Sequence, residues 1–173
     1  MIKELLEMNE LALFNKYDIN GNLIYYLDKD CTEEYTGHIE EYDRGVLCRE
    51  FDVVNGYLDG ICKEYFIKSN KIESITQMKY NMQNGLYIDF YENGKVQSIA
   101  IAIDNDYIDY IIYDDQGNIQ HNSFENEENR GAFIMAQQEL CIQELRKKYD
   151  LMKIHEEIVR DGVNFNYQKY FGL

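Results

Sequence analysis

The chain has 173 residues, 45% of them hydrophobic and 14% aromatic, which is enough to form one domain with a core. This composition excludes a disordered chain, and the formal net charge of −15 argues against partners such as nucleic acid or an anionic membrane. Residues 1–128 carry 26 Asp and Glu against 10 Lys and Arg, whereas residues 129–173 carry 6 against 7. The acidic part would attract a basic partner, although acidity can also serve solubility alone.

The N-terminal residues 1–16 carry apolar side chains at helical spacing and predict a helix that packs on the rest of the protein. The apolar positions of this pattern are Ile2, Leu5, Leu6, Met8, Ala12 and Leu13. The segment lacks the basic start and apolar block of a secretory signal. No stretch approaches the roughly 20 apolar residues that cross a bilayer. We therefore expect a cytoplasmic protein.

Residues 17–122 repeat a short phrase in which an aromatic residue and a polar spacer precede a turn residue. The turn residues are Gly21, Gly45, Asn70, Gly94 and Gly117, at spacings of 24, 25, 24 and 23. Gly and Asn are the residues that most readily adopt positive φ. A near-constant period of this length indicates a stack of structural repeats, and the five phrases predict five units.

A second turn signal lies between successive phrases, so each unit is expected to contain two strands. These signals are Gly37, Asn55-Gly56 with Gly60, Asn84-Gly85, and Asp104-Asn105-Asp106. Asn-Gly is typical of tight hairpin turns, and the segments 46–54, 61–67, 96–103 and 107–113 are rich in β-branched and aromatic residues. We predict an antiparallel meander of roughly ten strands within a mainly β fold with terminal helices (α+β).

The C-terminal residues 123–173 form the predicted helical part of the same domain. Apolar residues recur at helical spacing from Asn129 to Arg160, and Asp161-Gly162 supplies the expected end of the helix. The polar run 147–150 could divide this pattern, so one helix and a helical hairpin both remain open. Because the predicted strand 96–103 is apolar or small on both faces, we expect the terminal helices to cover the sheet.

Side chains with catalytic or metal-binding potential do not form a known motif. The three histidines, His38, His121 and His155, lack a second ligand at zinc spacing, and no Gly-rich phosphate loop or nucleophile elbow is present. The four cysteines, Cys31, Cys48, Cys62 and Cys141, have no paired spacing and are expected to be free thiols. We expect no enzyme, cofactor or metal, although a hydrolase that uses two carboxylates needs no motif and stays an alternative.

One segment combines acidic residues with tyrosines and is the candidate partner-binding surface. Its residues are Asp104, Asp106, Tyr107, Asp109, Tyr110, Asp114 and Asp115, with Tyr113 among them. Tyrosine beside charge is common at protein interfaces, where the ring gives rigid area and the hydroxyl a polar tip. Tyrosine is also ordinary on β-strands, so the pattern alone fits both a binding surface and a plain sheet.

The repeat unit resembles the MORN-variant repeat. The nearest copy is GLYIDFYENGKV at residues 85–96, and residues 60–72 and 37–47 follow the same plan. The match covers residues 17–119, with departures: Asn70 stands in place of the turn glycine, the last unit begins at Tyr107 without its leading glycine, and only the second half of the first unit is clear.

This resemblance implies a binding protein. Small bacterial proteins built from the variant repeat are similar to antitoxins and immunity proteins, which neutralise a toxin from the same or a neighbouring cell. We therefore expect a toxin-neutralising protein that blocks the active site of a cognate, basic toxin such as a nuclease domain. A scaffold or adaptor is the alternative. The sequence leaves the oligomeric state open.

Overall fold

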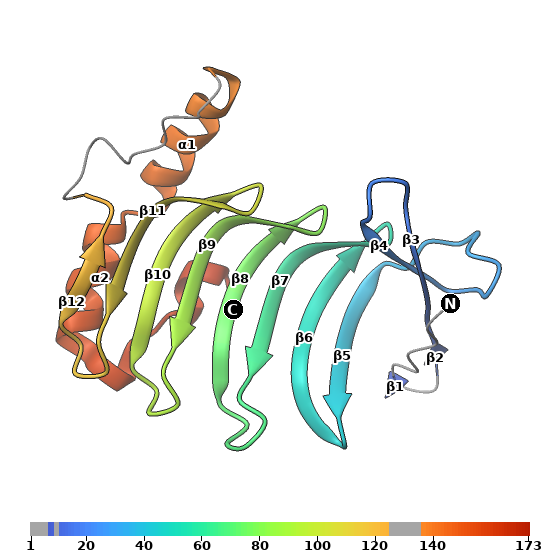
Figure 1. Cartoon of the computed structure of the whole chain (residues 1–173), viewed down its shortest axis with the longest axis horizontal. Helices are drawn as coiled ribbons and strands as arrows, with labels where there is room; N and C mark the ends of the chain where they lie inside the picture. Colours follow the sequence, from blue (N-terminus) through green and yellow to red (C-terminus); the bar gives the residue numbers. More distant parts are fainter. Residues whose placement is uncertain (1–6, 9–10, 125–135) are drawn as a thin grey trace.

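The computed structural model describes the whole chain except residues 1–6, 9–10 and 125–135 (Figure 1). It is a curved antiparallel sheet with helices on one face. The elements are β1 (Glu7–Met8), β2 (Leu11–Ala12), β3 (Phe14–Tyr17), β4 (Leu23–Tyr26), β5 (Gly37–Asp43), β6 (Val46–Val54), β7 (Tyr57–Tyr65), β8 (Ile72–Lys79), β9 (Met82–Phe90), β10 (Val96–Ile103), β11 (Asp106–Tyr113), β12 (Ile119–Asn122), α1 (Ala136–Lys148), α2 (Leu151–Asp161), a 3-10 turn (Gly162–Asn164) and α3 (Gln168–Phe171).

The main sheet is a meander in which β5 to β12 lie side by side in sequence order, every neighbouring pair antiparallel. The predicted meander is confirmed in this coarser form, with eight strands in the main sheet instead of roughly ten. The strands β3 and β4 form a separate hairpin. All five predicted turn residues have positive φ, including Asn70 at 52°.

Side chains at the two ends of the sheet tie neighbouring hairpins together. At one end, Lys71 Nζ donates to the carbonyl of Glu92 at 2.9 Å, and Lys95 Nζ donates to the carbonyl of Asp115 at 3.0 Å. At the other end, the side chain of Asn81 accepts from the backbone N–H of Leu58, at 2.7 Å. Asn105 accepts in the same way from Gln83 one hairpin later. The repeated turns therefore hold the sheet together as well as reversing the chain.

One predicted turn is in the wrong place. Asn84-Gly85 lies inside β9, and the chain reverses at Tyr80 and Asn81, which both have positive φ. Gly85 instead has a φ of 125°, and a Cβ there would lie 2.1 Å from Oε1 of Gln77. This glycine leaves room for the Gln77 side chain, which accepts from the N–H of Leu86 at 3.1 Å.

The structure does not show the N-terminal helix predicted for residues 1–16. Residues 1–6 and 9–10 lie outside the described part, and β1, β2 and β3 account for most of the rest. A short apolar run fits helix and strand equally well by periodicity, and here the extended form lets Leu13 join a core with Tyr25 and Phe51. The N–H of Tyr25 also donates to the carbonyl of Gly56 at 2.9 Å, which attaches this hairpin to the main sheet.

From Ala136 on, the C-terminal region is helical, as predicted, and divides into α1 and α2 at Tyr149 and Asp150. The first part of the predicted helix, residues 129–135, lies outside the described residues. Asp150 caps α2 by accepting from the N–H of Lys153, and Gly162 ends the helix as expected. The helices cover one face of β8 to β11, where the apolar side chains of both elements are buried together (Figure 1). No helix in the described part of the chain is both long and apolar enough to cross a membrane.

Candidate functional site

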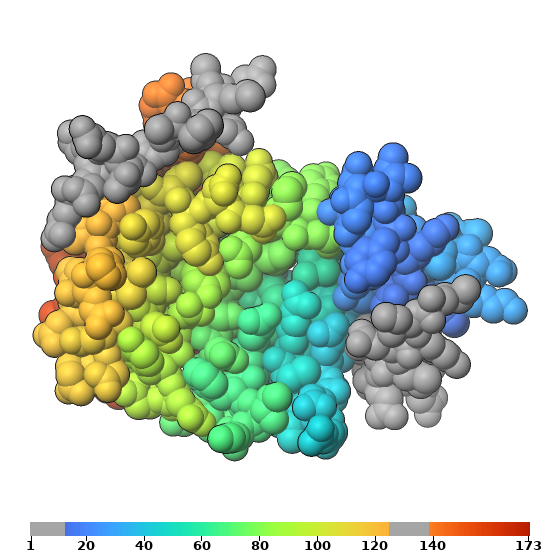
Figure 2. All heavy atoms as spheres, viewed as in Figure 1, coloured from blue at the N-terminus to red at the C-terminus, as the bar shows by residue number. Residues whose placement is uncertain are grey.

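The two faces of the main sheet differ in what covers them. On the helix-covered face, Ile75, Ile88, Ile99 and Ile111 lie opposite one another on successive strands and pack against the C-terminal helices. We call the other side the open face; the N-terminal hairpin covers it only at the β5 to β7 end. Figure 2 views the molecule from this side, with the helices behind the sheet.

A row of polar side chains crosses the open face, one from each strand. Strand pairing places its members next to one another, and we call them the carboxylate row: Glu41, Arg49, Glu64, Ser74, Asp89 and Ser98. Because side chains alternate between the faces of a strand, these residues all lie opposite the helices. Strands β5 to β10 thus present three carboxylates and one guanidinium along a single line.

Arg49 lies between the first two carboxylates of the row. Its guanidinium is 3.9 Å from Glu41 and 3.8 Å from Glu64, and it stacks on the ring of Phe51 at 4.7 Å from the ring centroid. Its Nε also donates to Sγ of Cys62 at 3.3 Å. The chain therefore supplies its own cation to this first pair of carboxylates.

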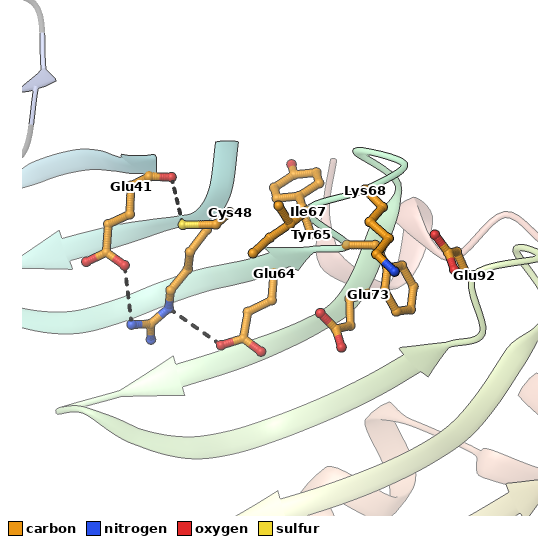
Figure 3. A pocket seen from close by; sticks show the side chains of 10 residues that line it. Glu41, Cys48, Glu64, Tyr65, Ile67, Lys68, Glu73 and Glu92 are labelled. Carbon is orange, nitrogen blue, oxygen red and sulfur yellow. Dashed lines mark hydrogen bonds and ion pairs between the residues drawn. The ribbon is translucent and has the colours of Figure 1, made fainter. Parts of the chain in front are cut away.

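An open groove of about 590 Å³ begins at Arg49 and extends toward the turn between β7 and β8. In Figure 3, dashed lines join Glu41 and Glu64 to the unlabelled guanidinium between them, which belongs to Arg49. Four glutamates line the groove against two cations, Arg49 and Lys68; the lining residues are Glu41, Cys48, Arg49, Glu64, Tyr65, Phe66, Ile67, Lys68, Glu73 and Glu92. The groove can therefore accept a positively charged segment, whereas it would repel an anion.

Asp89 is the third carboxylate of the row and is half-buried. The hydroxyl of Tyr87 donates to its Oδ1, and the hydroxyl of Ser98 donates to its Oδ2 at 3.3 Å. Burial raises the pKa of Asp89, and the charge of Glu64 adds to the rise, while the two hydroxyl donors oppose it. Burial and the bond to Asp89 also raise the pKa of Tyr87, whose ring packs on Tyr107 with centroids 5.5 Å apart.

The structure separates the acidic residues that the sequence grouped as a partner-binding surface. Asp104 and Asp106 lie at the turn between β10 and β11, and Asp114 and Asp115 lie at the opposite end of the sheet. Asp114 organises its turn by accepting from the N–H groups of Gln116 and Asn118, at 2.9 and 2.8 Å. The side-chain amide of Asn118, which donates to Asp114 Oδ2 at 3.0 Å, and these backbone bonds lower the pKa of Asp114, which is a sign of a structural carboxylate.

Asp109 is a correction to the predicted surface. It is 1% exposed and forms a bidentate ion pair with Arg146 of α1, at 2.5 and 3.1 Å, on the helix-covered face. Its neighbour Tyr110 points to the open face, where strand pairing places it in line with Tyr87. Of the predicted residues, Tyr107 and Tyr110 therefore lie on the open face, while burial removes Asp109 from any surface.

A second group of titratable side chains lies on the opposite face, at the β5 to β7 end. Ligand atoms of His38, Glu40 and Glu50 lie within 4.8 Å of one another, a proximity that spacing along the chain did not reveal. Two contacts already engage this group, since Lys63 is 2.5 Å from Glu50 and Asp52 is 2.9 Å from His38. Lys63 balances the negative charge of Glu50, which a metal ion would otherwise neutralise, and Asp52 engages a ring nitrogen of His38.

No protein-family model matches the chain, and no curated protein sequence matches it significantly.

The carboxylate row was missed because its members are spread over residues 41–98. Its signal was nevertheless present in the repeat. Glu64 and Asp89 occupy the same position in successive units, as do Arg49 and Ser74. Aligning the repeats by strand position, and not only by turn residue, would have placed these side chains in one row.

Proposed function

We propose that the protein is a MORN-variant repeat protein that neutralises a toxin, and that its open face binds a basic toxin domain and blocks the toxin's active site. The observation that carries this proposal is the carboxylate row with its adjoining groove. A line of acidic side chains on a rigid sheet suits a basic protein surface, because complementary charge speeds encounter and fixes the register of the two partners.

The position of the row also supports a binding role. The next row on the same face holds Phe51, on which the N-terminal hairpin packs, and Tyr87, which pairs with Tyr107. Aromatic side chains beside charged ones are typical of the energetically important centres of interfaces. Side chains held on a sheet lose little conformational entropy when a partner binds, and this favours tight association.

The test is coexpression with the product of the neighbouring gene. We expect the protein to restore growth of cells that make this toxin, and to bind it in a pull-down as a one-to-one complex that weakens with salt. Absence of both binding and rescue would refute the proposal. Binding to a host protein or to anionic vesicles without rescue would instead support the scaffold alternative, although the acidic surface should repel such vesicles.

A carboxylate-dependent hydrolase is the second candidate, favoured by the raised pKa of Asp89 beside Glu64. A protonated and an ionised carboxyl group in proximity can serve as acid and base. If this is the function, Asp89→Asn should abolish a measurable hydrolysis while leaving partner binding intact. We expect the opposite result, in which no hydrolysis depends on Asp89 and binding does.

A further inference from the structure

In the carboxylate row, one repeat unit has an arginine between two carboxylates, and the next unit has two carboxylates with no arginine between them. In the first unit, Arg49 stands between Glu41 and Glu64, and its guanidinium contacts both carboxylates. In the next unit the equivalent interval lies between Glu64 and Asp89, and Ser74 occupies the position of the arginine. The second pair of carboxylates therefore has a hydroxyl where the first has a cation.

The charge of Asp89 is uncompensated within the described part of the chain. There, no Lys or Arg forms an ion pair with it, and its partners are the hydroxyl groups of Tyr87 and Ser98. Ser74 donates to Glu64 at 3.3 Å, so the interval offers polar groups but no positive charge. Arg49 contacts Glu64 from the other side at 3.8 Å, so Asp89 is the carboxylate of this pair that has no cation among the described residues. A half-buried carboxylate without a cation is electrostatically unfavourable in the free protein.

A second, independent observation lies in the next row of the same face. Thr76 is 6% exposed, and its Oγ1 has no hydrogen-bond partner among the described residues. Thr76 lies directly opposite Tyr87 and two residues beyond Ser74 on β8. A buried hydroxyl without a partner is rare in folded proteins, and it is a group that a ligand or an ordered water would satisfy.

We propose that the interval between Glu64 and Asp89, over Ser74, is a binding site for an arginine side chain of a protein partner. The guanidinium would bridge the two carboxylates as Arg49 bridges Glu41 and Glu64, and its flat face would meet the tyrosine pair as Arg49 meets Phe51. Arginine fits better than lysine because its fork of donors can serve two carboxylates and a hydroxyl together. The identity of the partner that supplies the arginine rests on the proposed function, whereas the site itself is inferred from the structure alone.

The test uses the full chain and N-acetyl-arginine amide, whose neutral ends leave only the guanidinium charge. A titration followed by ¹H–¹⁵N NMR should show saturable shifts centred on the amides of Ser74, Tyr87 and Asp89. N-acetyl-citrulline amide, which has nearly the same shape and no charge, should produce no such shifts. We expect Asp89→Asn to weaken binding by about tenfold, the usual effect of removing a charged hydrogen-bond acceptor.

Two further variants sharpen the result. Ser74→Arg places the chain's own arginine at the position equivalent to Arg49 and should abolish binding of the probe. Asp115→Asn removes the same charge as Asp89→Asn from the distant turn and should leave binding unchanged. The inference is overturned if Asp89→Asn and Asp115→Asn bind the arginine amide alike, if citrulline amide binds equally, or if no saturable shift appears. If Ser74→Arg does not fold, the comparison of Asp89→Asn with Asp115→Asn still tests the proposed arginine site.

This experiment is separable from the test of function. Rescue from the toxin without binding of the arginine amide would overturn the arginine site alone. Binding of the arginine amide without rescue would overturn the proposed function alone.

Discussion

Asp89 shows at the residue scale how a proposed binding residue can cost stability. Its pKa is raised in the folded protein, so folding favours the protonated form and the ionised form is a burden at neutral pH. The stability linked to this residue is therefore fully present below the ordinary value of 3.8 and is lost as the pH rises through the folded-state pKa. A carboxylate whose role is to bind a partner is expected to lower the stability of the folded protein at neutral pH in this way.

We predict that Asp89→Asn raises the melting temperature at pH 7 by about 1 to 2 °C, which corresponds to roughly 0.5 kcal/mol after allowance for solvent screening. The asparagine cannot ionise, so it avoids the cost of the buried charge. Thermal unfolding followed by circular dichroism at several pH values checks this. The difference from the wild type should vanish below pH 3.8, and a variant that melts lower at pH 7 would contradict the assignment.

Asp109 is the opposite case, a buried carboxylate that serves the fold. Arg146→Ala would remove the bidentate guanidinium from a carboxylate that is 1% exposed. We expect a loss of about 2 to 3 kcal/mol in the free energy of unfolding, somewhat less than for a fully buried pair because Arg146 is partly exposed. Urea unfolding measures this loss. The exposed Arg160→Ala should cost much less, and equal losses would show that the burial of Asp109 is unimportant.

At the element scale, the attachment of the N-terminal hairpin depends on Gly56. This residue has a φ of 81°, and a Cβ there would lie 2.4 Å from Cγ2 of Ile24 and 3.1 Å from the carbonyl of Tyr25. Its own carbonyl and N–H bond to Tyr25 and Tyr35. The turn between β6 and β7 thus both reverses the chain and receives the hairpin that covers one end of the open face.

We predict that Gly56→Ala lowers the free energy of unfolding by about 2 to 3 kcal/mol, because the positive φ costs about 1 to 2 kcal/mol and the collision adds to it. Gly94→Ala is the matched control, since Gly94 also has a positive φ of 86° but nothing within 4 Å of its Cβ. The loss of unfolding free energy in Gly94→Ala should be only the cost of placing an alanine at positive φ. Urea titrations that give the two variants the same loss would contradict the role assigned to Gly56.

The strands and their turns could be predicted where a residue has a single physical reason to be present. Asn70 was placed in a turn by its spacing, and it has the expected positive φ. Asn84-Gly85 was misassigned because glycine serves two purposes in this sheet, and here it makes room for Gln77. The carboxylate row could not be predicted in full, because it depends on pairing across six strands whose register shifts at bulges such as the one between Glu64 and Tyr65.

For the molecule as a whole, the N-terminal hairpin and the C-terminal helices cover opposite faces of the sheet, and they lie toward its opposite ends. The N-terminal hairpin packs on the open face around Phe51, and the C-terminal helices pack on the other face beneath β8 to β11. Each cover buries apolar side chains that the sheet alone would expose. Among the described residues, neither the N-terminal hairpin nor the C-terminal helices cover the central part of the open face, where the carboxylate row lies.

The most direct test of the central claim, that the open face binds a basic toxin, compares two double variants that each lose two negative charges. Glu64→Gln with Asp89→Asn changes the carboxylate row, and Asp104→Asn with Asp115→Asn changes the two ends of the sheet. The dissociation constant of each for the toxin from the neighbouring gene would be measured by calorimetry. We predict that the first weakens binding by about a hundredfold and the second by less than about threefold. Equal losses, or a greater loss for the second variant, would contradict the account.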